Sequence, residues 1–275
     1  MRTSPDAEPL PSSSPHYGAT DTVPELSLPS WRKMMGEGPA IARLLARQFR
    51  SPPIRCAPMQ VAPVMVLPGF MTGDFHTNLL RRTIRGCGGR AFGWGQGLNT
   101  GMDVDKFARL LRRVDQLAED AGNLVLIGWS LGGLYARELA KRRPDRIAMV
   151  ITLGTPFSHG PGRNYGRPVY NLLNAHDVDH MPVAEHPGQK PPVFTVACWS
   201  AAEGMVAPLS SFGEDDEADV RVQLDCMHHD MVTDPDAVRT LLALLKAERA
   251  LRSSARPASP AEVAPGSPAG DQLEA

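Results

Sequence analysis

Ser130 is flanked by Gly128 and Gly132, each two positions away. The apolar run 123–129 before it is typical of a buried strand, and the apolar spacing in 130–142 predicts a helix. A serine on a tight turn from strand to helix lies next to free backbone N–H groups, and glycines let neighbouring backbone approach it. We therefore predict that Ser130 is a nucleophile and that Gly128 and Gly132 shape the turn around it.

A serine hydroxyl is a weak nucleophile, and it needs a base that is itself held by an acid. In sites built on such a turn, the acid and then the histidine follow the serine along the chain. Glu203 follows the apolar run 191–198, in a turn that contains Gly204, and it is our preferred acid. The alternatives are four aspartates of the neighbouring loops: Asp177, Asp179, Asp215 and Asp216.

The base is expected between the last predicted strand, 219–225, and the last predicted helix, in which Pro235 takes the first position. That interval contains His228 and His229, and its position alone does not choose between them. Neighbouring side chains point apart on extended backbone, so we do not expect the two histidines to share a metal ion.

Apolar runs and helical patterns alternate along the middle of the chain. Strands are predicted at 64–69, 90–94, 123–129, 147–154, 191–198 and 219–225, and helices at 31–50, 75–86, 103–122, 130–142 and 234–249. Gly36, Gly38 and Pro39 are expected to divide the first helix into two pieces. The alternation predicts an α/β fold with a mostly parallel sheet of about six strands and helices on both faces. Ligands of such sheets bind beyond the carboxyl ends of the strands, where the three candidate residues are expected.

Both ends of the chain have the composition of disordered tails. Residues 1–30 are rich in proline, serine and threonine, and residues 251–275 show no apolar periodicity. We predict one domain over 31–250. Within it, residues 157–190 are rich in glycine, proline and histidine, and we expect this insert to form a short cap over the site.

The charge balance and the cysteines limit the function classes. The chain has 275 residues, with 29 Lys and Arg against 30 Asp and Glu, which argues against nucleic acid as a partner. We find no apolar signal segment and no apolar run long enough to span a membrane, so we predict a cytoplasmic protein. The four cysteines are scattered, which favours reduced thiols but leaves room for one disulfide: Cys56, Cys87, Cys198 and Cys226.

The segment 31–50 carries five basic residues against a single acid, Glu37, and its apolar residues recur at helical spacing. A basic amphipathic helix can lie on an anionic membrane surface. Packing on the flank of the domain is the simpler interpretation, and we prefer it. Peripheral membrane contact through 31–50 is the alternative.

The chain resembles the α/β-hydrolases from about residue 31 to 248, specifically a poorly characterised bacterial group of lipase- and esterase-like members. The resemblance is based on six stretches: VLPGF (66–70), GWGQGLNTG (93–101), LIGWSLGG (126–133), LGTP (153–156), WSAAEGMV (199–206) and HHDMVTDP (228–235). It implies that His228, seven residues before Pro235, is the base. It places Glu203 at the acid position, where the group usually has aspartate. It also implies an oxyanion hole made by the backbone N–H groups of Leu131 and Phe70.

Together these features predict a serine hydrolase that cleaves small carboxylic esters through an acyl-enzyme and needs no cofactor. The glycine-rich stretch 86–97 does not have the order of strand, glycine motif and helix that a dinucleotide site requires. The polar, proline-rich cap favours short- to medium-chain esters. An acyltransferase or thioesterase would use the same three residues, and a non-catalytic binding protein would share the fold, so these stay as alternatives.

Overall fold

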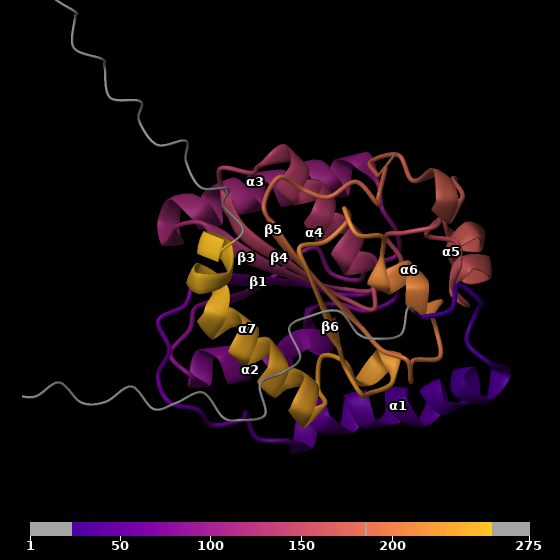
Figure 1. The fold of residues 1–275 in the computed structure, drawn as a ribbon, viewed down its shortest axis with the longest axis horizontal. Coiled ribbons are helices and arrows are strands. Elements are labelled where there is room, and N and C mark those ends of the chain that lie inside the picture. Colours follow the sequence, from indigo (N-terminus) through magenta and orange to yellow (C-terminus); the bar gives the residue numbers. More distant parts are fainter. Residues whose placement is uncertain (1–23, 185, 255–275) are drawn as a thin grey trace, which may run out of the picture.

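A six-stranded, wholly parallel sheet forms the centre of the computed structural model, which describes residues 24–184 and 186–254 (Figure 1). The strands are β1 (Val64–Leu67), β2 (Ala91–Gly93), β3 (Leu124–Trp129), β4 (Ile147–Leu153), β5 (Phe194–Trp199) and β6 (Val220–Gln223). They lie side by side in the order β2-β1-β3-β4-β5-β6. The predicted α/β fold with about six parallel strands is confirmed.

The helices follow the strands in alternation. The α-helices of the described residues are α1 (Trp31–Arg50), α2 (Asn78–Gly86), α3 (Val104–Ala121), α4 (Leu131–Arg142), α5 (Arg167–Leu173), α6 (Pro208–Phe212) and α7 (Pro235–Ser254). Three short 3-10 helices complete the set: η1 (Asp74–Thr77), η2 (Val178–His180) and η3 (His228–Asp230).

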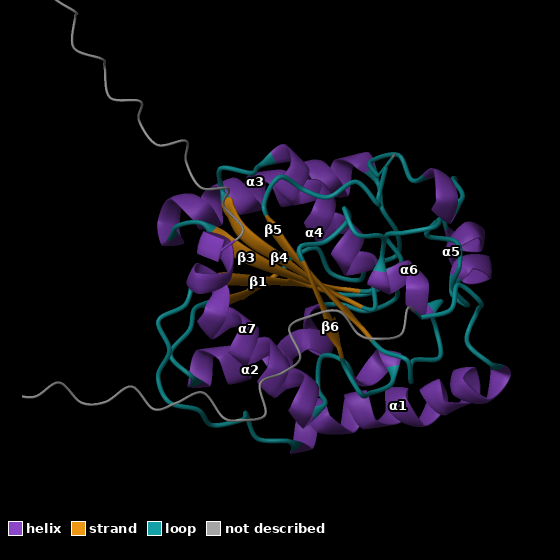
Figure 2. Ribbon diagram, viewed as in Figure 1, coloured by secondary structure: helices purple, strands orange, loops and turns teal. Residues whose placement is uncertain are grey.

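Helices cover both faces of the sheet (Figure 2). On one face, Leu44 of α1, Leu80 of α2 and Leu241 of α7 belong to one apolar cluster. On the other face, Phe107 of α3 and Tyr135 of α4 belong to a second cluster. Alternate side chains of β3 enter the two clusters, because successive residues of a strand point to opposite faces. The central strands are therefore buried from both sides, and their carboxyl ends are left to form a site.

The first helix is continuous, so the prediction that it breaks near Pro39 is wrong. Pro39 lies on the exposed side of α1, where water can replace the lost helical hydrogen bond. On the opposite side, the Gln48 side chain donates to the carbonyl oxygen of His76 (2.6 Å) and accepts from the N–H of Leu79 (2.8 Å). Such tertiary contacts stabilise the helix across its weak point. One face of the helix packs on the flank of the domain, and its opposite face is exposed.

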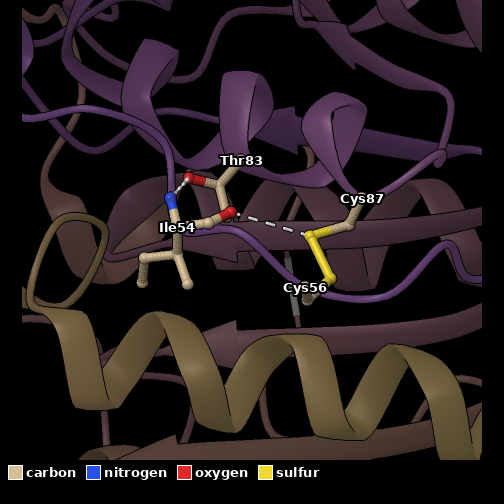
Figure 3. The surroundings of a disulfide bond; sticks show 4 residues. All are labelled: Ile54, Cys56, Thr83 and Cys87. Atoms are coloured by element: carbon tan, nitrogen blue, oxygen red, sulfur yellow. Dashed lines mark hydrogen bonds between the residues drawn. A yellow bond between two sulfur atoms is a disulfide. The ribbon is translucent and has the colours of Figure 1, made fainter.

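A disulfide joins Cys56 to Cys87 (Figure 3). Cys198 and Cys226 are free and buried. The expectation of four reduced thiols is therefore corrected in favour of the single disulfide that the sequence allowed. The bond ties the segment between α1 and β1 to the end of α2. Beside it, the N–H of Ile54 donates to the Thr83 hydroxyl (3.3 Å), so the two segments are also joined by a hydrogen bond. Spacing could not reveal this pairing, because the two cysteines are 31 positions apart.

Reduction of this disulfide is expected to lower the free energy of unfolding by about 3–4 kcal/mol, since it releases a closed loop in the unfolded chain. Urea denaturation with and without a reducing agent measures the change. Cys56→Ser is the control, because its stability should not respond to the reducing agent. An unchanged midpoint for the wild-type protein on full reduction would contradict the prediction.

The predicted tails lie largely outside the described residues, which begin at 24 and end at 254. The described part of the first tail is attached to the domain, because Glu25 accepts from the N–H of Leu209 (3.2 Å) and Pro29 accepts from the Tyr165 hydroxyl (2.7 Å). At the other end, α7 continues to Ser254. Among the described residues, no helix has the length and apolar character that crossing a bilayer requires.

Candidate active site

Ser130 lies between the end of β3 and the start of α4, with a φ of 54° and a ψ of −124°. Residues other than glycine rarely adopt positive φ, so the backbone here is strained and must be held by its surroundings. Its N–H donates to the carbonyl oxygen of Leu153 (2.8 Å), and its carbonyl oxygen accepts from the Thr155 hydroxyl (2.9 Å). Both partners belong to β4 and the turn after it, so the neighbouring strand fixes the turn.

Gly128 and Gly132 are required by close backbone contact. A Cβ atom on Gly132 would lie 2.3 Å from the carbonyl oxygen of Leu67, at the end of β1. A Cβ atom on Gly128 would lie 2.4 Å from the Cα atom of Gly133. Any side chain at either position would push α4 away from the sheet, so the sequence prediction for these two glycines has a direct steric basis.

His228 and Glu203 form a buried pair near Ser130. Nδ1 of His228, in η3, lies 2.6 Å from Oε2 of Glu203, which comes from the turn after β5. The pair lies against the end of β4, because a Cβ atom on Gly154 would lie 2.9 Å from His228 Nδ1 and 3.0 Å from Glu203 Oε2. The indole N–H of Trp129 donates to the carbonyl oxygen of His228 (3.1 Å) and fixes the loop. With Nδ1 bound to the carboxylate, Nε2 is the ring nitrogen left for chemistry.

Burial and charge act in opposite directions on this pair. Burial by itself would lower the pKa of His228, but the charge and hydrogen bond of Glu203 outweigh it and raise that pKa above its usual value. Burial raises the pKa of Glu203, against the opposing effect of His228. The second carboxylate oxygen of Glu203, Oε1, is buried without a hydrogen-bond partner among the described residues. The acid therefore depends on His228 to stabilise its charge.

A cavity of about 90 Å³ lies next to Ser130, and both His228 and His229 line it. The insert 157–190 contributes part of its wall, through Asn164, Gly166, Tyr170 and Val178. These four residues of the insert therefore lie beside Ser130, at the carboxyl end of β3.

The four rival aspartates lie elsewhere. Asp177 and Asp179 pair with Arg167 of α5, at 3.5 Å and 3.1 Å. Asp215 and Asp216 are exposed, as their charged surroundings suggested. Within the part of the chain that the structure describes, none of the four forms a hydrogen bond or ion pair with His228. Glu203 is the carboxylate that the structure brings to this histidine.

Phe70 and Leu131, the expected oxyanion-hole residues, both line the cavity beside Ser130. The loop that carries Phe70 is held at two points: the Thr72 hydroxyl donates to the carbonyl oxygen of Gly69 (2.7 Å), and the Asn99 amide donates to that of Pro68 (2.8 Å). These bonds fix the backbone around Phe70 before any ligand arrives, as an oxyanion site requires.

Comparison with known proteins agrees with this architecture. Residues 67–176 match a family described as the α/β hydrolase fold. An esterase of Pyrobaculum calidifontis is structurally similar, with a TM-score of 0.56 and 13% identity, over 80% of this chain and 92% of that chain. This chain has the α/β-hydrolase fold. A metagenome-derived lipolytic enzyme is also similar in structure, with a TM-score of 0.51 and 16% identity, over 69% of this chain and 95% of that one.

A curated relative shares a shorter stretch of sequence with this chain. The biotin biosynthesis bifunctional protein BioHC of Teredinibacter turnerae is 39% identical over 61 residues. That stretch is 22% of this chain and 10% of the relative, so the match spans about a tenth of the curated protein's length.

Glu37 of α1 belongs to the candidate site, and the sequence interpretation missed it. Its carboxylate accepts from the N–H groups of Gly204 (2.7 Å), His228 (3.0 Å) and His229 (3.2 Å), and it lies 2.8 Å from Nδ1 of His229. One buried side chain thus holds both the loop of the acid and the loop of the histidines. The available signal was a lone acid, seven residues before the apolar Leu44 and therefore on the buried face of a basic helix.

The charge of Glu37 is well compensated. Burial would raise its pKa, but the hydrogen bond of His229, the charge of His228 and the N–H of Gly204 lower it to about 2. Two arginines of α1 add to the attachment, because Arg43 (3.2 Å from Nε) and Arg47 (2.8 Å) both bind the carboxylate of Asp230 in η3. Three side chains of the stretch CMHHDM (226–231) therefore have different partners. His228 binds Glu203, His229 binds Glu37, and Asp230 binds the two arginines. In the described residues, no group of His, Cys, Asp and Glu side chains is arranged to hold a metal ion.

Proposed function

We propose that the protein is a serine hydrolase of carboxylic esters, and the buried pair of His228 and Glu203 beside the strained Ser130 carries the proposal. Ser130 Oγ attacks the ester carbonyl while Nε2 of His228 takes the hydroxyl proton, and Glu203 stabilises the imidazolium that forms. The tetrahedral intermediate collapses, the carbon–oxygen bond to the alcohol breaks, and His228 returns the proton to the leaving oxygen. Water then attacks the acyl-enzyme by the same route and releases the acid.

The oxyanion of each intermediate is expected to bind the backbone N–H groups of Leu131 and Phe70. Leu131 is the first residue of α4, where helical N–H groups have no carbonyl acceptor within the helix. Donors that are fixed before reaction stabilise developing charge most effectively. The Phe70 loop is held by Thr72 and Asn99, which supports this assignment.

The size of the cavity supports small substrates. A volume of about 90 Å³ is well below the roughly 300–1,000 Å³ of pockets that enclose drug-sized ligands. Apolar and aromatic side chains, among them Leu134, Tyr170 and Val206, make up much of its wall. We therefore propose short- to medium-chain esters as the substrate class.

Labelling with a fluorophosphonate probe tests the chemistry, because the probe reacts with activated serines. Wild-type protein is expected to be labelled, and Ser130→Ala is expected not to be. A series of p-nitrophenyl esters from acetate to palmitate tests the substrate class, with the maximum expected among the shorter chains. A wild-type protein that resists labelling would favour the ligand-binding alternative, and labelling without ester turnover would favour acyl transfer to another acceptor.

Glu203→Gln is expected to lower kcat by about 10²- to 10⁴-fold, since an amide cannot stabilise the imidazolium form of His228. It should also shift the acid limb of the kcat/KM profile to lower pH. The base must be neutral to act, the charge of Glu203 raises the pKa of His228, and removing that charge lowers it. Asp177→Asn is the matched control and should leave turnover and the pH profile unchanged. Near-normal turnover in Glu203→Gln would contradict the assignment of the acid.

Glu37 is a positioning residue in this proposal, and Glu37→Gln is expected to lower kcat/KM by about 10- to 100-fold through misplacement of the two loops. The acid limb of the kcat/KM profile of this variant should also move to lower pH, because the charge of Glu37 contributes to raising the pKa of His228. Gln48→Ala removes another buried contact of the same helix face and serves as the control. A purely structural role for Glu37 would give the same pH profile in both variants.

A further inference from the structure

We propose that the outward face of α1 docks on an anionic lipid surface. This face is the side opposite to the buried positions Glu37, Ala40, Leu44 and Gln48. The proposal concerns a binding surface and stands independently of the chemistry at Ser130.

One line of exposed positions along α1 carries only apolar residues and glycine. At steps of three and four residues, the exposed positions are Trp31, Met35, Gly38, Ala42, Leu45 and Phe49. Trp31 and Phe49, at the two ends, expose 66% and 77% of their surface. A helix on the flank of a water-soluble domain normally turns polar residues outward, so this pattern needs a partner of apolar character. Figure 1 shows α1 along the lower margin of the molecule.

The apolar face continues from α1 toward the candidate active site. The ring of Phe49 lies 5.2 Å from that of Phe75, which is itself exposed. Met71, in the same segment between β1 and α2, is also exposed and directly follows Phe70 of the cavity wall. The exposed apolar residues therefore extend from the far end of α1 to the neighbourhood of the cavity.

The charges on α1 favour an anionic lipid partner. The only acid of the helix is the buried Glu37, and Arg43 and Arg47 are used by Asp230. Among the described residues, Arg32 and Arg50 have no ion-pair partner, and both lie next to the ends of the apolar line. Cations beside an apolar helix face, with a tryptophan at one end, match the layers of a membrane surface: anionic head groups above an apolar interior. A second copy of the chain would bring the same unpaired cations together, which disfavours self-association.

Trp31 provides a direct optical test, because it is exposed while the other three tryptophans of the chain, Trp94, Trp129 and Trp199, are buried. Vesicles of phosphatidylcholine and phosphatidylglycerol are expected to shift the tryptophan emission of the full-length protein to the blue and to protect it from acrylamide. Vesicles of phosphatidylcholine alone should do so much less, and added salt should weaken the effect.

Co-sedimentation with the same mixed vesicles identifies the residues involved. The double variant Trp31→Ser/Phe49→Ser should lose at least about 10-fold in partitioning, while Arg32→Glu/Arg50→Glu should lose at least about fivefold per residue. Val104→Ser is the matched control, because Val104 is equally exposed (61%) at the start of α3 on the other face of the sheet. All of these variants should hydrolyse a soluble p-nitrophenyl ester at the wild-type rate, which separates docking from catalysis.

Three results would overturn the proposal. The first is that the wild-type protein does not sediment with anionic vesicles. The second is that the variant Trp31→Ser/Phe49→Ser sediments as well as the wild type. The third is that the wild-type protein forms a dimer and the variant Trp31→Ser/Phe49→Ser is a monomer, which would identify a second copy of the chain as the partner.

Discussion

Ser130→Ala is expected to reduce kcat/KM for p-nitrophenyl acetate by about 10³- to 10⁶-fold. In the proposed mechanism, the variant has no oxygen to attack the ester, so His228 and the oxyanion hole could only assist water. The backbone cost at this position is the same for serine and alanine, because both carry a Cβ atom at a φ of 54°. The loss should therefore appear in turnover and not in stability. Steady-state kinetics together with thermal unfolding measure the two quantities separately.

Ser210→Ala is the matched control for this change. The hydroxyl of Ser210 is buried and has no hydrogen-bond partner among the described residues, so its removal should affect neither activity nor stability by much. If Ser130→Ala kept more than a tenth of the wild-type activity while the control behaved normally, the nucleophile would have to be sought elsewhere in the cavity.

His228→Ala is expected to cost about 10³- to 10⁶-fold in kcat, and His229→Ala about 10-fold or less. Both rings line the cavity, and each binds a carboxylate through Nδ1, so exposure to the cavity does not separate them. Their positions do. The pair of His228 and Glu203 lies against Gly154 at the end of β4, whereas His229 is turned toward α1 and Glu37.

The pH dependence gives a second criterion for the base. The pKa of His228 is raised, whereas burial lowers the pKa of His229 despite the hydrogen bond and charge of Glu37. The acid limb of kcat/KM should therefore lie above the usual range of histidine in the wild type and move little in His229→Ala. If His229→Ala were the inactive variant and His228→Ala the active one, the roles of the two residues would be exchanged.

Much of the fold could be predicted because local patterns determine it. Buried parallel strands such as β3 and β4 are continuous apolar runs, and α3 has an aspartate cap, an apolar stripe and a final glycine. The turn at Ser130 could be found because two glycines around a serine, between a strand and a helix, form a local pattern, although the contact that requires Gly132 is with the distant Leu67. The positions of the acid and the histidines followed from strand ends, which parallel sheets place at one edge.

What the sequence did not reveal depends on contacts between distant segments. Gly36, Gly38 and Pro39 predict a break in α1, and only the buried contacts of residues such as Gln48 explain why the helix continues. The disulfide pairs two of four scattered cysteines, a choice that depends on how α2 packs beside the segment before β1. No local pattern indicates that the acid of a basic helix will meet two loops from the other end of the chain.

The contact of Glu37 with the two loops has a consequence during synthesis of the protein. Glu37 is translated before its partners at positions 204, 228 and 229, which follow 167 to 192 residues later. Glu37 therefore cannot hold the loops of Glu203 and of the two histidines until residue 229 has been translated.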